Sequence, residues 1–203
     1  MTSHQTDRSL SRRAALAGLG ATGLAAGLAA AHPVAAAEAA VQMANHPLVG
    51  AWLVGRAPDD IAVAHWGPDG SMTTNRPTVG VGADGKFTSS DPALGSWVPI
   101  TERAIHFVFT NRTYDATGAF TGYVTVEGHP VVGDDGMSFW DDAVEARVTI
   151  RDANGVVIQS FGGDGSVPPI GGVRLVPGQS GYEEMLAMLA KRRAATLKVG
   201  TSS

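Results

Sequence analysis

Two glutamates stand where they would supply acid–base chemistry. Glu127 and Glu145 lie in two long strand-like runs. Tyr123 shares the run of Glu127, Arg147 shares the run of Glu145, and His106 lies in the preceding run. If these side chains point into a common interior, Glu127, Tyr123, His106 and Arg147 form a general acid–base cluster beside apolar walls. If they point the other way, they form the wet outer face of a small barrel, where polar strand residues usually lie.

The histidines do not follow a metal-binding pattern. His65, His106 and His129 fall in or at the end of strand-like runs, and three histidines on neighbouring strands are able to bind zinc or iron. No H-x-H or H-x-x-x-H spacing occurs, so we expect no metal site and no cofactor. The chain also lacks cysteine and a G-x-S-x-G motif, and therefore carries no signature of a covalent nucleophile.

A set of aromatic residues offers the walls of an apolar pocket. Ligand sites are mostly apolar, with a few placed polar groups. The alternative is a core filled by its own side chains, because an eight-stranded barrel is only just wide enough for a small ligand. The six candidate ligand-binding residues are Trp66, Trp97, Phe107, Phe109, Phe120 and Trp140.

The elements that must position these residues are β-strands joined by tight turns. Signals such as Pro68-Asp69-Gly70 and Ala153-Asn154-Gly155 recur along residues 47–178, because Asp-Gly and Asn-Gly supply the positive φ of hairpins. Eight or nine strand-like runs lie between the turns, the longest at 120–132 and 137–152. Such a series predicts an antiparallel meander, and closure into a barrel removes its exposed edges.

Alternating residue types indicate which side chains share a face. Along 105–110 the odd-numbered residues are apolar and their even-numbered neighbours are more polar. The same period of two places Phe120 on the face of Val124, and Trp140 on the face of Val148. One face of the sheet is therefore expected to be buried.

One helix is expected after the strands. Ser180-Gly181-Tyr182-Glu183 is a capping box, and apolar residues then recur at helical spacing along one face. We predict a helix over 179–196 that docks on the outside of the barrel or covers one end, and a disordered tail over 197–203.

Gly50-Ala51-Trp52 opens the first strand-like run, and Arg174 lies in the last one. Together with the meander and the C-terminal helix, these residues resemble the lipocalin-like (calycin) barrels, and most closely the small exported bacterial ones. The resemblance implies that Trp52 packs under the barrel floor against Arg174, in a structural cation–π contact of roughly 0.5–2 kcal/mol. It also implies a tendency to bind apolar ligands, but it does not point to any particular reaction.

Residues 1–37 resemble a twin-arginine export signal. Arg12-Arg13 precedes an uncharged Ala/Gly/Leu run, and small residues lead to Ala37. We expect export by the twin-arginine translocase, cleavage after Ala37 and a flexible leader over 38–46 before a barrel over 47–178. No stable membrane span would remain after cleavage, and the protein would lie in the cell envelope, extracellular or periplasmic.

The charge of the exported part argues against one class of partner. Residues 38–203 carry 12 Lys and Arg against 18 Asp and Glu, a net charge of −6. Because no basic stripe crosses the strand region, we expect no nucleic-acid partner.

These observations predict an all-β fold, an antiparallel eight- to nine-stranded up-and-down barrel with a C-terminal helix. The leading functional hypothesis is binding of a small apolar molecule in the barrel. The alternatives are a cofactor-free isomerase or cyclase acting on an apolar substrate, and a structural or partner-binding envelope protein with a filled core. An inward apolar set of Phe107, Val124 and Val148 around a space would favour binding. Inward Glu127 and Tyr123 would favour the enzyme, and a filled centre would favour the structural function.

Overall fold

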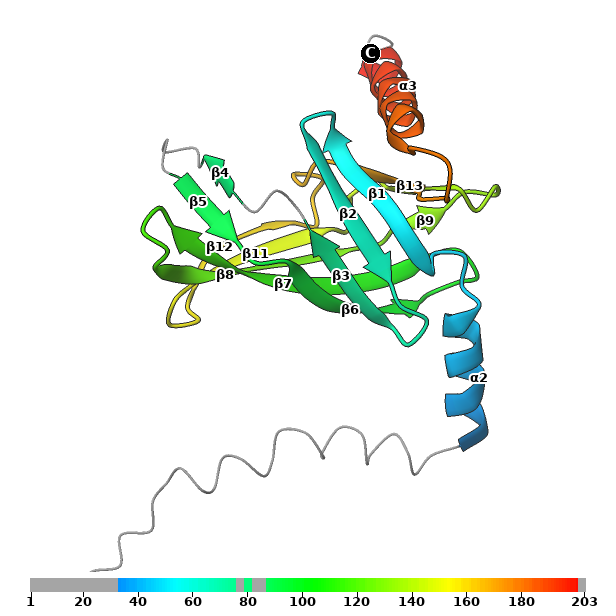
Figure 1. The fold of residues 1–203 in the computed structure, drawn as a ribbon, viewed down its shortest axis with the longest axis horizontal. Helices are drawn as coiled ribbons and strands as arrows, with labels where there is room; N and C mark the ends of the chain where they lie inside the picture. Colours follow the sequence, from blue (N-terminus) through cyan, green and yellow to red (C-terminus); the bar gives the residue numbers. More distant parts are fainter. Residues whose placement is uncertain (1–32, 76–78, 82–86, 201–203) are drawn as a thin grey trace, which may run out of the picture. The chain divides into compact units, whose positions relative to one another are not determined.

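The computed structural model describes residues 33–75, 79–81 and 87–200, and Figure 1 shows the fold. Its described residues fall into two units, 33–41 and 42–200. The two arginines and the apolar run of the predicted export signal lie outside the described residues.

Helix α2 (Pro33–Ala44) covers most of the segment that we expected to be a flexible leader. It is rich in alanine, the strongest helix former, and Pro33 stands at its first position, where a missing N–H costs nothing. The predicted cleavage position after Ala37 therefore falls inside a helix. Met43, in its last turn and already part of the second unit, packs against the apolar core of that unit.

The second unit is mostly antiparallel β-sheet. Eleven strands follow one another by hydrogen bonding in the order β12-β11-β8-β7-β6-β3-β2-β1-β13-β10-β9, while β4 pairs with β5, which also pairs with β7. The described strands are β1 (Gly50–Ala57), β2 (Asp60–Trp66), β3 (Ser71–Asn75), β4 (Val79–Val81), β5 (Phe87–Ser90), β6 (Ala93–Pro99), β7 (Ile105–Asp115), β8 (Phe120–Gly128), β9 (Val131–Val132), β10 (Ser138–Asp141), β11 (Arg147–Asp152), β12 (Val157–Gly162) and β13 (Ile170–Arg174).

The sheet curls so strongly that it forms a half-barrel (Figure 1). Val131 of β9 bridges to Ala104, directly before β7. The amide of Ile105 donates to the carbonyl of Pro130 at 3.2 Å, and the amide of Val132 to that of Arg103 at 2.9 Å. These bonds join β9, at one end of the strand order, to the start of β7 in its middle. We call this part of the half-barrel the closed end. The wide end is formed by β11, β12 and the first half of β8. The predicted all-β antiparallel class is confirmed.

The predicted number of strands is too low, because both long runs are broken. Pro130, which has no N–H to donate to a ladder, separates β8 from β9. Residues 142–146 separate β10 from β11, and Ala143 among them has φ of +61°. A non-glycine residue with positive φ does not continue a strand.

Two aromatic rings of β10 pack against two glycines of β13. Phe139 pairs with Gly172, and Trp140 pairs with Gly171. A Cβ on Gly172 would lie 2.0 Å from Cε1 of Phe139, and a Cβ on Gly171 would lie 2.9 Å from Cε3 of Trp140. Since neighbouring strand residues point to opposite faces, Phe139 lies in the concave core and Trp140 on the convex side.

Helix α3 (Tyr182–Gly200) packs on the outside of β1 and β13 (Figure 1). Ser180 and Glu183 of the predicted capping box meet at the start of the helix, where the Ser180 hydroxyl binds the Glu183 carboxylate and accepts the Tyr182 amide at 3.3 Å. These bonds differ from the two reciprocal side chain–backbone bonds of a capping box. Met185 and Leu189 are buried with Val173 of β13. The helix continues to Gly200, through residues where we expected a disordered tail. Within the described residues, no helix is long and apolar enough to cross a membrane.

Candidate functional site

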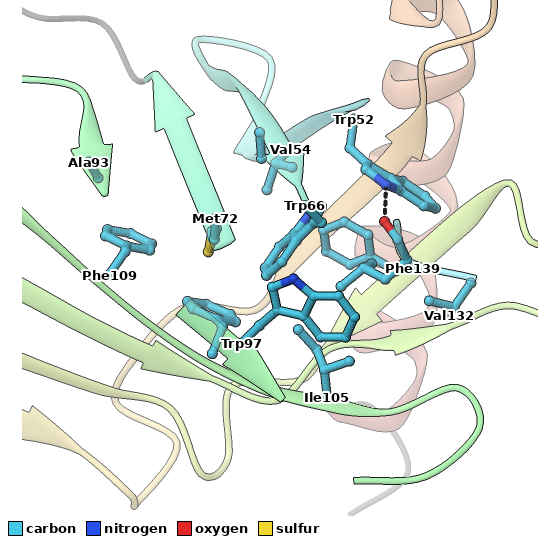
Figure 2. Packing of buried hydrophobic residues seen from close by; sticks show 13 residues of the cluster. Trp52, Val54, Trp66, Met72, Ala93, Trp97, Ile105, Phe109, Val132 and Phe139 are labelled. Atoms are coloured by element: carbon cyan, nitrogen blue, oxygen red, sulfur yellow. Dashed lines mark hydrogen bonds between the residues drawn. The ribbon is translucent and has the colours of Figure 1, made fainter. Parts of the chain in front are cut away.

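The concave face at the closed end is filled with apolar side chains (Figure 2). Trp66 and Trp97 are each 2 % exposed, and Phe107 and Phe109 are each 7 % exposed. A cavity of about 20 Å³ remains among Trp66, Phe107, Phe109 and their neighbours. That volume holds about one water molecule, whereas small-molecule sites have roughly 300–1,000 Å³. The closed end is therefore a packed core.

Four of the six predicted wall residues belong to this core, and two do not. Phe120 is half-buried, and its ring centroid lies 6.1 Å from that of Tyr114 and 5.0 Å from that of Tyr123. Trp140 is half-buried on the convex side, where the guanidinium carbon of Arg192 lies 4.7 Å from its ring centroid. The expectation that Phe120 and Trp140 line the interior with Trp66 is wrong.

A second apolar surface lies on the concave face toward the wide end. Val126 packs against the core, and it pairs with Val148 of β11. The same face continues through the pairs Ile150–Val124 and Val148–Phe161. All five side chains are half-buried. We call them the wide-end surface: Val124, Val126, Val148, Ile150 and Phe161.

The predicted acid–base residues lie on the opposite, convex face. Because Val126 faces the core, the alternation of β8 turns Glu127 and Tyr123 outward. His106 Nε2 lies 3.6 Å from Glu127 Oε2, with both side chains more than one-third exposed. Arg147 pairs with Glu127 along β11 and β8, while Tyr123 lies farther along β8. The structure thus brings His106, Glu127 and Arg147 together, but not inside the half-barrel.

The convex face also holds a histidine pair. The rings of His106 and His129 stack with centroids 4.6 Å apart and planes 7° apart. His129 Nδ1 lies 3.9 Å from Glu145 Oε2. Among the described residues, no group of three or more His, Cys, Asp or Glu side chains is arranged to hold a metal ion.

The predicted floor contact between Trp52 and Arg174 is present. The guanidinium carbon of Arg174 lies 4.4 Å from the Trp52 ring centroid. Trp52 is fully buried, and its Nε1 donates to the Leu48 carbonyl at 2.8 Å, the bond dashed in Figure 2. This contact holds the first and last strands of the half-barrel together.

Two buried ionisable groups had no predicted role. His46 is 4 % exposed, accepts the Leu48 amide on Nδ1 at 3.2 Å, and lies with its ring 5.4 Å from that of Trp97. Loss of hydration on burial lowers the pKa of His46. Asp141 is 3 % exposed and accepts the amides of His129 and Ala143, and burial raises the pKa of Asp141. Neither stands in a sequence motif, so only tertiary packing reveals them.

Comparisons with protein-family models, with curated proteins and with solved structures found no match to this chain.

Proposed function

We propose that this chain is an exported, lipocalin-like protein that binds a small apolar molecule on the wide-end surface. The observation that carries the proposal is the gradient of burial along one concave face. Phe107 and Phe109 are nearly inaccessible, whereas Val124, Val148 and Ile150 on the continuation of that face are only half-buried. The apolar concave face of the sheet thus extends beyond the part that is buried in the protein's core.

The driving force for such binding is burial of the apolar area that remains exposed. Each 100 Å² of apolar surface removed from water contributes about 2.5 kcal/mol before the cost of association is subtracted. The five side chains of the wide-end surface carry no charge or hydrogen-bonding group, so they favour an uncharged apolar body. This site replaces the closed-end aromatics, which already fill the space among themselves.

No comparable support exists for the isomerase or cyclase alternative. Its candidate residues Glu127, Tyr123 and His106 face away from the apolar concave surface, so an apolar substrate held there would not meet them. The filled core at the closed end also suits a structural envelope protein, and the following experiment separates that function from binding.

The test is titration of the full chain with Nile red, an uncharged apolar dye. We expect saturable fluorescence with the unmodified protein, and an affinity weakened by about tenfold or more in Val148→Asp, because a charge would be left in an apolar site. Thr149→Asp is the matched control, since Thr149 is also half-buried but points to the convex face. Thermal unfolding of both variants checks that they fold.

Two results would overturn the proposal. If the unmodified protein shows no saturable dye binding, the structural function is favoured instead. If Val148→Asp and Thr149→Asp weaken Nile red binding equally, the dye does not bind at the wide-end surface. Native mass spectrometry of protein purified from its host then names the class of any bound molecule.

A further inference from the structure

The convex side carries a groove that belongs neither to the core nor to the wide-end surface. It lies between the β1–β2 turn, the loop before β13 and helix α3, and its volume is about 600 Å³. That volume falls within the range of small-molecule sites. We call it the helix groove. Its aliphatic wall consists of Pro58, Pro168, Pro169, Leu186 and Leu189.

Two arginines stand in this apolar setting. Arg56 comes from the end of β1 and Arg192 from helix α3. Arg192 lies over the Trp140 ring, a cation–π arrangement that positions its guanidinium. Arg56 binds the Asp60 carboxylate through Nε. A guanidinium has five N–H donors in a planar fork that matches a carboxylate.

The residues that line the groove carry two positive charges, and one of them, on Arg56, is paired with the Asp60 carboxylate. Among the described residues that line the groove, none is acidic. Two adjoining hollows, of about 370 and about 300 Å³, share Trp140 and Arg192 and add Lys191 and Arg103 respectively. Asp142 is their only acidic lining residue in the described part of the chain. Arg103 is paired with Asp134, so the positive charge nearest to the groove comes from Arg192 and Lys191.

We infer that the helix groove is a second ligand site, which binds a small carboxylate with an alkyl chain. The arginines would pair with the carboxylate in charge-assisted hydrogen bonds. The alkyl chain would lie against the proline and leucine wall, because one face of the Trp140 ring is already covered by Arg192. The site lies on the convex side and is independent of apolar binding at the wide-end surface.

The experiment is isothermal titration of the full chain with decanoate, and with decan-1-ol as the uncharged ligand of equal chain length. We expect decanoate to bind at least about tenfold more tightly than decan-1-ol, since an ionic hydrogen-bonded pair contributes an order of magnitude or more. The double variant Arg56→Gln/Arg192→Gln is expected to remove that preference. Arg112→Gln is its control, because Arg112 likewise pairs with an aspartate, Asp91, but lies on β7 outside the groove.

A pair of alanines on helix α3 provides a second test that spares the arginines. Ala190 lines the groove and Ala187 does not, and both are exposed. Glutamate is a good helix former, so neither substitution should unfold the helix. Ala190→Glu should weaken decanoate binding by about tenfold through charge repulsion, while Ala187→Glu should leave it unchanged.

Three results would overturn the inference. They are equal affinities for decanoate and decan-1-ol, unchanged decanoate binding in the double arginine variant, and equal effects of the two glutamates. Loss of decanoate binding in Val148→Asp, with the arginine variant unaffected, would assign the carboxylate to the wide-end surface instead. Nile red binding is measured separately, so a negative result at one site does not refute the other site.

Discussion

Arg174 of the last strand lies directly opposite Trp52 of the first, with its guanidinium carbon 4.4 Å from the Trp52 ring centroid. The same guanidinium donates from Nε to the Gly136 carbonyl and from Nη1 to the Val49 carbonyl, each at 2.9 Å, and from Nη2 to the Pro47 carbonyl. One side chain thus joins the segment before β1, the β9–β10 turn and β13.

Substituting Arg174 should therefore destabilise the fold more than substituting an ordinary surface arginine. We expect Arg174→Leu to lower the free energy of unfolding by about 2–4 kcal/mol, since three carbonyls lose a charged donor. Arg151→Leu is the control, because Arg151 is exposed and donates to one carbonyl, that of Gly155. Its expected loss is within about 0.5 kcal/mol. Urea denaturation measures both, and equal losses would contradict a special structural role for Arg174.

Burial of His46 should make stability depend on pH. Burial lowers the pKa of His46 in the fold, so the unfolded chain binds a proton more readily. The stabilisation is present above about pH 6.5, the ordinary value, and is lost as the pH falls below it, by at most about 1.4 kcal/mol per pH unit.

The variant His46→Gln isolates this effect, because it removes this buried proton site while the other histidines remain. We expect the free energy of unfolding of the unmodified protein to fall more steeply between pH 7 and pH 5 than that of His46→Gln. Parallel pH profiles from denaturant titrations would show that His46 is not responsible.

Gly172 should tolerate no side chain. A Cβ there would lie 2.0 Å from Cε1 and 2.4 Å from Cζ of Phe139, a ring held in the packed core. We expect Gly172→Ala to cost about 2–3 kcal/mol from overpacking. Adding Phe139→Leu should recover part of the loss.

The control for this substitution is Gly155→Ala. Gly155 has φ of +83°, and a Cβ at this position would meet no atom within 4 Å. Its substitution should cost about 1 kcal/mol through backbone strain alone. A loss for Gly172→Ala no larger than this would mean that the Phe139 ring moves aside easily.

Export should depend on both arginines of the proposed signal. We expect Arg12→Lys/Arg13→Lys to leave the protein inside cells that possess a twin-arginine translocase, because that route requires the arginine pair. Arg8→Lys leaves the pair intact and should be exported normally. Fractionation followed by immunoblotting measures the exported share, and equal shares for the two variants would refute the assigned route.

The errors in assigning faces arise where a strand loses its regular alternation. Trp140 and Val148 are both even-numbered, so unbroken alternation places them on one face. The segment between β10 and β11, with its positive φ at Ala143, interrupts the alternation. As a result, Trp140 lies on the convex face and Val148 on the concave face. Near the start of β8 the register shifts, with Thr113 opposite Gly122 but Tyr114 opposite Phe120. A bulge of this kind is not visible in residue types, because it changes the register without changing the apolar pattern.

The amino-acid sequence by itself determined the antiparallel strand class, the order of the turns, the presence of a helix directly after Ser180 and the Trp52–Arg174 contact. These follow from local turn chemistry, from capping and from a motif resemblance. Only the tertiary structure decided which apolar face is filled and which stays half-exposed, because that depends on how tightly the sheet curls. It alone also placed Arg56 and Arg192 along one groove, since a strand end and a distant helix line the same hollow only after α3 docks on the sheet.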